Sequence, residues 1–395
     1  MMLTIKIIFW VLLGIVLYSY LGYGIFLWII VFIKKTFSKS QNIKTETEPE
    51  VTLFIAAYNE KDYVENKVMN SLSLDYPKDK LHHLWVTDGS DDGSEKLLAT
   101  YSQIKVLHQL ERRGKINAMN RGMQAVKTPI VVFCDANTML SENCIRSIVE
   151  AFNDKKVGCV AGEKRILKKS ADSAAGSGEG IYWKYESFLK KMDSEFYTTV
   201  GAAGEIFAIR TSLFKEVETD SLLDDFMMSM RIAIDGYKIK YVPEAYATET
   251  SSANVKEELK RKVRIAAGAI QSIFRLKEAL NPFHNFLLFF QYISHKFLRW
   301  IAVPIALPLL YFFNCCLVLR NGLFTCNLYE WLFCFQTIFY LMALLGWLFQ
   351  SNNVRLKVFF VPYYIFIMNL AMWLGFFRFL KGKQTVNWER AKRAD

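Results

Sequence analysis

The sequence predicts an α/β domain joined to several membrane-spanning helices. Between residues 51 and 280, short apolar segments typical of buried strands alternate with helical patterns, which indicates a largely parallel sheet. Long apolar runs flank this region on both sides. Three of the short segments are each followed directly by polar residues. Because ligands bind beyond the carboxyl ends of the strands in open α/β sheets, these polar residues mark the predicted site.

The central predicted strand covers residues 130–134 and runs directly into Asp135, Ala136 and Asn137. An acidic residue at this place is also common in turns that have no function. Two companion segments give the pattern its weight. Residues 51–57 end in Ala57 and lead into Tyr58, Asn59 and Glu60, and residues 83–87 lead into Asp88. We expect the three carboxyl ends to meet at one edge of one sheet.

The apolar runs predict four membrane spans. The first run extends from Leu3 to Ile33, and the others cover residues 297–319, 328–349 and 358–380. Each approaches or exceeds the length of about 20 residues that a helix needs to cross the hydrocarbon core. The first run has no cleavage site after it, so we interpret it as an anchor. Lys34 and Lys35 follow at once and place this end of the helix in the cytosol.

The predicted organisation therefore has five parts. They are a membrane anchor at residues 1–33, an α/β domain at 34–280, an interfacial helix at 281–296, three membrane segments at 297–380 and a basic tail at 381–395. Four spans would put the basic tail outside, against the tendency of positive residues to stay in the cytosol.

The composition excludes some functions. Hydrophobic residues make up 52% of the chain, which the membrane runs explain, and the net charge is +11. Basic loops and contact with anionic membrane lipid account for this charge. No clustered basic face with a nucleic-acid module is recognisable, so we expect no nucleic-acid partner. The seven Cys and five His form no metal motif, and the thiols fit a reduced, cytosolic domain.

Local patterns predict the remaining elements. Helices are expected at 60–74, 91–100, 116–126, 141–153, 181–192, 224–234 and 255–280, and strands at 104–107, 157–166 and up to Arg210. Ser141 is the expected N-cap of its helix. The segment 170–180 is rich in Gly and Ser and is expected to form a loop. Residues 283–294 are expected to form a helix lying on the bilayer.

The polar residues at the strand ends suggest a site for a nucleoside diphosphate. Asp88 is placed to bond a base or ribose, and Asp135 to hold a divalent cation beside a diphosphate. Lys115 would bind a phosphate group, although a run of basic residues exposed to solvent would explain the local sequence equally well. Asp225 is a candidate general base. The alternative for Asp224 and Asp225 is an acidic helix N-terminus that interacts with the helix dipole.

The order of these segments resembles that of the membrane-bound family 2 glycosyltransferases, which include hyaluronan, chitin, cellulose and poly-N-acetylglucosamine synthases. The resemblance covers nearly the whole chain. Ala57, Tyr58 and Glu60 resemble the family's nucleotide-binding turn, Asp88 resembles its uridine-binding motif, and Lys115 matches its basic residue. Asp135 and Asn137 lie where the DxD metal motif belongs. Asp224 and Asp225 match the ED pair, and Arg261 and Arg264 lie where the QxxRW motif belongs.

The resemblance implies a GT-A-type domain that moves a sugar with inversion from a nucleotide sugar, most simply a UDP-sugar, to a glycan or lipid-linked acceptor. It implies Asp225 as the catalytic base, Mg²⁺ or Mn²⁺ as the cofactor, and contacts of Asp224, Arg261 and Arg264 with diphosphate or acceptor. It also implies an integral protein of the plasma (inner) membrane with a cytosolic catalytic domain. The residues from Gly382 through Trp388 to Arg390 resemble the tail of such synthases.

Three departures from the family pattern keep alternatives open. Asn137 replaces the last Asp of DxD, and Arg261 and Ile265 replace the Gln and Trp of QxxRW. The loss of that Trp favours a single-addition glycolipid transferase as the second hypothesis. A non-catalytic membrane scaffold is the third, and the presence of Asp88, Asp135 and Asp225 argues against it.

Overall fold

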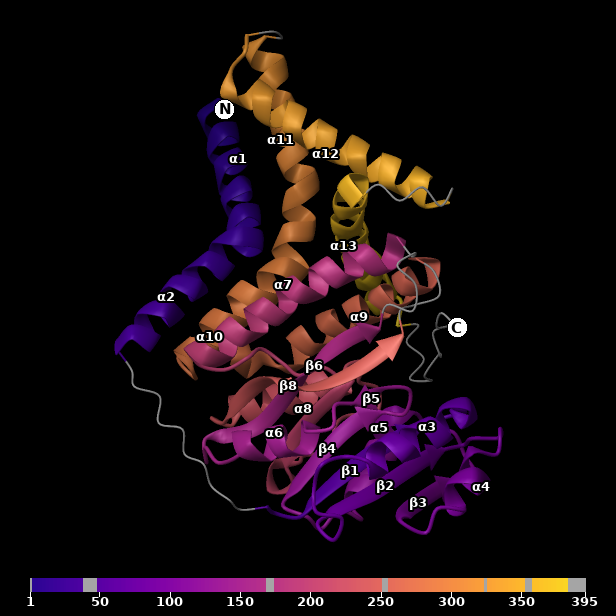
Figure 1. The fold of residues 1–395 in the computed structure, drawn as a ribbon. Helices are drawn as coiled ribbons and strands as arrows, with labels where there is room; N and C mark the ends of the chain where they lie inside the picture. The colour runs from indigo at the N-terminus through magenta and orange to yellow at the C-terminus, as the bar shows by residue number, and fades with distance from the viewer. Residues whose placement is uncertain are drawn as a thin grey trace.

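The computed structural model describes residues 2–37, 48–167, 174–250, 255–322, 325–351 and 357–382. An α/β domain lies at one end of the molecule, and long helices extend away from it at the other (Figure 1). The predicted α/β class is confirmed. The predictions for the tail, including Trp388 and Arg390, and for residues 170–173 fall outside the described residues.

The described strands form one sheet with the order β3-β2-β1-β4-β7-β6-β8-β5. Their bounds are β1 Val51–Ala57, β2 Leu81–Asp88, β3 Ile104–Gln109, β4 Ile130–Asp135, β5 Met139–Leu140, β6 Val157–Leu167, β7 Ile206–Arg210 and β8 Lys238–Thr250. Strands β1 to β4 are parallel, and β7 is antiparallel to both β4 and β6. Ala56 pairs with Asp135 and Ala57 with Thr87, so β1, β2 and β4 end level with one another. This register brings the three predicted polar ends to one edge.

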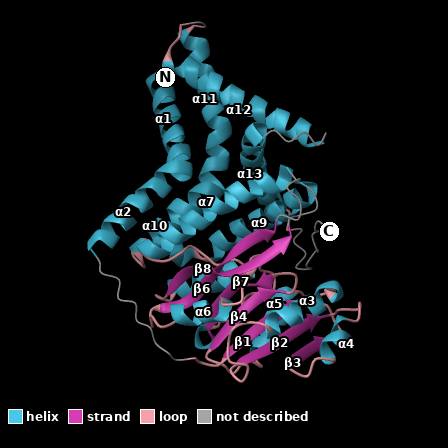
Figure 2. Ribbon diagram, in the orientation of Figure 1, coloured by secondary structure: helices cyan, strands magenta, loops and turns pink. Residues whose placement is uncertain are grey.

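Alternation along the central strands separates two hydrophobic layers. Helices pack around the sheet at this end of the molecule (Figure 2). Val51, Leu53 and Ile55 of β1 face a core that includes residues of α3 (Lys61–Leu72), α4 (Ser94–Ala99) and α6 (Cys144–Ala151). Phe54 and Ala56 face the opposite core, to which α5 (Lys115–Met123) and α8 (Asp224–Ile234) contribute. A strand buried on both faces reads as a continuous apolar run, which is why β1 and β4 were visible in the sequence.

Two long helices, α7 (Ala174–Phe196) and α9 (Val255–Arg275), lie between the sheet and the membrane helices (Figure 1). The prediction of a loop through residue 180 is wrong from Ala174 onward, because α7 starts there. Leu189 and Met192 of α7 are buried against Tyr23 and Leu27 of the first membrane helix. Tertiary packing of this kind outweighs the weak helix propensity of Gly and Ser.

Four described helices are long and apolar enough to cross a membrane: Met2–Phe37, Phe286–Arg320, Leu328–Phe349 and Val358–Leu380. The first comprises α1 (Met2–Leu17), a π-helical turn (Tyr18–Gly22) and α2 (Tyr23–Phe37). The second comprises α10 (Phe286–Tyr292), a π-helical segment (Ile293–Ala302) and α11 (Val303–Asn321), and α12 (Leu328–Ser351) and α13 (Lys357–Leu380) follow. The helix expected to end at residue 294 therefore continues into α11.

Two further local predictions are corrected. The helix at 141–153 is α6, whose N-cap position is Asn143. The Ser141 hydroxyl instead donates to the carbonyl of Glu244 and accepts from the Tyr246 amide, which ties it to β8. Helix 255–280 is α9 followed by a 3₁₀ turn at Lys277–Leu280. The sequence patterns also missed β5 and β8, which pair with each other across more than 100 residues of chain.

Candidate active site

A cavity of about 1750 Å³ lies between the edge of the sheet, α8, α9 and the membrane helices. Nine of the predicted site residues line it: Tyr58, Glu60, Lys115, Asp135, Asn137, Asp224, Asp225, Arg261 and Arg264. Ala57 and Asp88 line a small neighbouring cavity, which Tyr58 and Lys115 also border. The structure therefore brings all the predicted residues to one region. Among the described residues that line the large cavity, ten are Lys or Arg and seven are Asp or Glu, so its wall suits anionic ligands.

Lys115 joins the carboxylates of two separate elements. It begins α5, and its ammonium lies 2.9 Å from Oδ1 of Asp135 at the end of β4 and 3.5 Å from Oδ2 of Asp224 in α8. Burial by itself would lower the pKa of Lys115, but the charges of Asp135, Asp224 and Asp225 raise it above its usual value. Burial also raises the pKa of Asp135, and the charge of Lys115 opposes that change.

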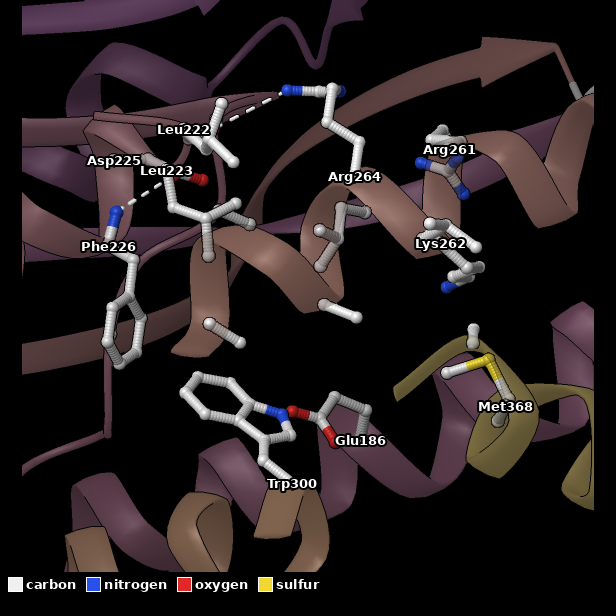
Figure 3. Close-up of a pocket in the computed structure, with 18 of the residues that line it drawn as sticks. Glu186, Leu222, Leu223, Asp225, Phe226, Arg261, Lys262, Arg264, Trp300 and Met368 are labelled. Atoms are coloured by element: carbon white, nitrogen blue, oxygen red, sulfur yellow. Dashed lines mark hydrogen bonds between the residues drawn. The ribbon is translucent and has the colours of Figure 1, made fainter. Parts of the chain in front are cut away.

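Asp225 occupies the first turn of α8 and faces the cavity (Figure 3). Its Oδ1 accepts a hydrogen bond of 2.8 Å from the Phe226 amide. Burial and the neighbouring charge of Asp224 raise the pKa of Asp225 to about 7. A general base works best when its pKa is close to the operating pH, so this carboxylate is suited to accept a proton near neutrality.

The loop before β7 forms another wall beside Asp225. The Ser229 hydroxyl of α8 accepts from the Ala202 amide and fixes the loop to that helix. Gly201 has a φ of +85°, and a Cβ there would lie 2.3 Å from the Phe226 ring. A Cβ on Gly204 would lie 3.3 Å from Oδ2 of Asp225. Gly201 therefore needs to be glycine because of its positive φ and the Phe226 ring, and at Gly204 the backbone passes close to the base.

Asp88 organises the loop that leads into Lys115. Its carboxylate accepts from the backbone amides of Arg113 and Gly114, the latter at 2.6 Å. The Arg112 guanidinium lies 3.8 Å from the centroid of the Tyr58 ring, and both residues border the small cavity beside Asp88. That cavity measures about 10 Å³, which is too small for a nucleobase. A base bound beside Asp88 therefore requires Arg112 to move.

The two arginines of α9 approach the cavity from the side opposite the sheet. Arg264 donates to the carbonyl of Leu222 at 3.4 Å (Figure 3). Arg261 forms an ion pair of 3.0 Å with Glu258. Burial lowers the pKa of Arg264, although an arginine stays charged under all ordinary conditions. Ile265 also lines the cavity.

Comparison with known proteins decides the family. Residues 49–268, more than half of the chain, match the sequence model of the family described as glycosyltransferase like family 2. The chain belongs to glycosyltransferase family 2. It is therefore an enzyme that takes its sugar from a nucleotide-sugar donor. The matched segment lies within the predicted α/β domain of residues 34–280.

Curated relatives of this family 2 enzyme are polysaccharide synthases. It is 29% identical to a poly-β-1,6-N-acetyl-D-glucosamine synthase of Staphylococcus aureus over 255 residues, which cover 62% of this chain and 60% of that protein. The corresponding synthase of Staphylococcus epidermidis is 28% identical, over 62% of this chain and 61% of its own length. The matched region thus spans about three fifths of these relatives.

A solved structure confirms the GT-A fold of the α/β domain and matches nearly the whole chain. A mannosyltransferase from Pyrobaculum calidifontis, solved in complex with GDP-mannose and Mn²⁺, superimposes with a TM-score of 0.69. The match covers 95% of this chain and 99% of that one at 20% sequence identity. It includes the membrane helices as well as the α/β domain.

The residues at the end of β4 fit a divalent cation that arrives with the donor. Among the described residues, no group of three or more His, Cys, Asp and Glu side chains is arranged to hold a metal ion. Mg²⁺ needs no such group, since one or two carboxylates together with substrate phosphates and water complete its octahedron. Asp135 and the amide oxygen of Asn137 would supply the protein ligands.

Sequence reasoning missed several residues that line the same cavity. The carboxylate of Glu205 forms an ion pair of 2.6 Å with the ammonium of Lys164. Burial by itself would raise the pKa of Glu205, but the charge of Lys164 lowers it. Glu186 and Lys190 come from α7, and Trp300 comes from the π-helical segment. The cluster of aromatic residues in the predicted helix at 181–192 was the one visible signal of this wall. No motif spacing distinguishes these residues from an ordinary polar or aromatic surface.

Proposed function

We propose that this enzyme transfers a sugar with inversion from a UDP-sugar to the hydroxyl of a glycan or lipid-linked acceptor, for polysaccharide or glycolipid synthesis. The observation that carries the proposal is the convergence of Asp225 and Asp135 on one cavity, with Lys115 between their elements. One carboxylate is suited to remove a proton, and the other to stand beside a diphosphate. N-Acetylglucosamine is the first sugar to test, given the names of the relatives.

The chemistry is a single displacement. Asp225 accepts the proton of the acceptor hydroxyl while its oxygen attacks the anomeric carbon from the face opposite the diphosphate. The new glycosidic bond forms as the bond from that carbon to the phosphate oxygen breaks, and the nucleoside diphosphate leaves with the bonding electrons. Lys115 and Arg264 stabilise the charge that develops on it. A bound Mg²⁺ or Mn²⁺ at Asp135 and Asn137 would supply further neutralisation of that charge.

The orientation in the membrane is part of this proposal. Lys34 and Lys35 lie in the last turn of α2, at the end of the first membrane helix, and contact the end of α7. Lys34 donates to the carbonyl of Glu195 at 2.8 Å. Lys35 forms an ion pair of 2.9 Å with the Glu195 carboxylate. Basic residues next to a span favour the cytosolic side, so the catalytic domain would face the cytosol beneath the plasma membrane.

Substitution of the base tests the proposal. Asp225→Asn should reduce transfer by about 10²–10⁴-fold and leave UDP binding nearly intact, because the base acts on the acceptor in the transition state. Asp235→Asn is the control, since Asp235 ends α8 in an ion pair with Lys215 and does not line the cavity. Release of nucleoside diphosphate and mass of the product are measured with a panel of nucleotide sugars. Equal rates for Asp225→Asn and the wild type would refute the assignment.

The product separates the remaining hypotheses. A ladder of increasing polymer length indicates a processive synthase, and one added sugar indicates a glycolipid transferase, which Ile265 in place of Trp favours. The scaffold hypothesis requires that no nucleotide sugar of the panel is turned over, even by the wild-type protein in a lipid membrane.

A further inference from the structure

The active-site cavity continues beyond Asp225 along a membrane helix. On that side it is lined by residues of α13 from Val361 to Arg378, a stretch of about 25 Å at about 1.5 Å per residue. Most of these residues are apolar, including Ile365, Met368 and Met372, and Leu21 of the first membrane helix joins them. Met368 lies across the cavity from Lys262 of α9 (Figure 3). An apolar wall of this length suits a hydrocarbon chain better than the hydroxyl groups of a glycan.

A buried cation lies on the wall that α7 contributes. Lys190 lines the cavity with only 7% of its surface exposed. Its ammonium lies 5.8 Å from the centroid of the Trp183 ring and 6.0 Å from that of Tyr241. No hydrogen bond and no ion pair joins its ammonium to another described residue, and Glu186 is the acidic residue that most favours its charged form. Burial lowers the pKa of Lys190 from its ordinary value, and the charge of Glu186 partly opposes this change.

The neighbouring acidic residues are already engaged. Glu186, one helical turn before Lys190, interacts with His295, Lys296 and Arg299, the last at 3.1 Å. These cations lower the pKa of Glu186 although burial opposes them. Two further buried lysines lie near Trp183, and both are paired. Lys164 pairs with Glu205 and Glu249, and Lys262 pairs with Glu258 at 3.5 Å. A buried charge without a partner is costly, so Lys190 indicates an anionic group on the ligand.

The sugar end of the cavity has an aromatic residue beside the base. The Trp300 ring lies 5.4 Å from that of Phe226, which directly follows Asp225. Figure 3 shows Trp300 and Glu186 on the wall opposite Arg264. Lys190, Glu205 and Asp225 line the same cavity, so the buried cation and the base face one continuous space. An acceptor in this space meets a base, an aromatic ring, a cation and then an apolar wall.

We propose that the acceptor is a sugar joined through a phosphate to an apolar lipid chain. The phosphate would bind Lys190, the chain would lie along α13, and the sugar would present its hydroxyl to Asp225 beside Trp300. Its identity as acceptor rests on the proposed transferase function, whereas its binding does not. The bonds of the phosphate stay intact during transfer, because the new bond forms at the sugar hydroxyl.

Direct binding of a simple probe tests this site without any donor. The full-length protein is placed in phosphatidylcholine nanodiscs, and binding of radiolabelled farnesyl phosphate is measured. Saturable binding is expected, and Lys190→Gln should weaken it about tenfold or more, because a hydrogen bond to a charged group is lost. Lys190→Arg should retain most of the affinity. Lys191→Gln is the matched control, since Lys191 is the adjacent lysine and is exposed.

Competition experiments separate the parts of the proposed ligand. Farnesol, which lacks the phosphate, and inorganic phosphate, which lacks the chain, should each compete far less well than unlabelled farnesyl phosphate. Equal competition by farnesol would overturn the role of the phosphate, and equal competition by inorganic phosphate would overturn the lipid. Farnesyl phosphate binding that is the same in Lys190→Gln and the wild type would overturn the whole assignment.

Thermal unfolding distinguishes a ligand-binding lysine from a structural one. Because burial disfavours the charge of Lys190, Lys190→Met should keep or raise the Tm of the ligand-free protein while it weakens probe binding. A lower Tm with unchanged probe affinity would assign Lys190 a packing role instead. A wild-type protein that turns over donor but binds no farnesyl phosphate would overturn this proposal and leave the transferase function standing.

Discussion

The ammonium of Lys115 and the carboxylate of Asp135 form an ion pair of 2.9 Å at the carboxyl end of β4. Each side chain is 20% exposed, so the pair faces the cavity and remains accessible to a ligand. A divalent cation at Asp135 would share that carboxylate with a positive neighbour, which weakens metal binding by repulsion. The second protein ligand, Asn137, adds no negative charge to offset this effect.

Asn137→Asp should therefore shift the metal requirement to a lower concentration. A second carboxylate favours a hard divalent cation and also offsets the charge of Lys115. The turnover rate need not increase, since tighter binding of the metal in the ground state does not by itself accelerate the chemical step. The measurement is activity against Mn²⁺ concentration for both proteins. Superimposable curves would show that Asn137 is a turn residue and leave Asp135 as the protein ligand.

The pH dependence of transfer should report Asp225. Because the base acts only when it is deprotonated, kcat/KM should rise with pH, reach half its maximum near pH 7 and level off above it. A flat profile between pH 5 and pH 8 would contradict this role. The raised pKa also means that the folded protein holds this proton more tightly than the unfolded chain does. Asp225 therefore contributes less to stability as pH rises from about 4 to about 7.

Asp225→Asn should accordingly have opposite effects on activity and stability. At pH 8 the variant lacks the disfavoured charge, so its Tm should equal or exceed that of the wild type while transfer is lost. At pH 5, where the Asp225 carboxyl is mostly protonated, the difference in Tm should shrink. A variant that unfolds at a lower Tm than the wild type at pH 8 would show that the carboxylate stabilises the fold.

Close packing of α13 on α9 should make Gly375 intolerant of a side chain. A Cβ at Gly375 would lie 2.5 Å from the Cβ of Ala266 and 2.8 Å from the Ala267 amide nitrogen. Overpacking of this kind typically costs about 1–3 kcal/mol, so Gly375→Ala should lower the Tm. It should also reduce transfer, because α9 carries Arg261 and Arg264. Gly14→Ala is the control, since a Cβ at Gly14 meets nothing within 4 Å; equal Tm values for the two variants would refute the contact.

The nucleotide half of the site could be predicted because its residues follow local patterns. Asp88 and Asp135 end buried parallel strands, and Asp224 and Asp225 open an amphipathic helix. Each pattern needs only a few consecutive residues. Because parallel strands end at the same edge of a sheet, their polar ends can be placed together from the sequence alone. The membrane spans were predictable for the same reason, since twenty apolar residues form a local signal.

The acceptor side was decided only by the tertiary structure. Lys190 looks like any basic residue of a helix until α7 is packed against the first membrane helix and its surroundings become dry. Glu205 becomes informative only when Lys164 of β6 reaches it. Trp300 falls within the predicted membrane run at 297–319 and becomes informative only when it packs beside Phe226. Burial and pairing are properties of contacts between distant segments. The sequence alone determined the fold class and the candidate base, and long-range packing decided which other side chains face the base.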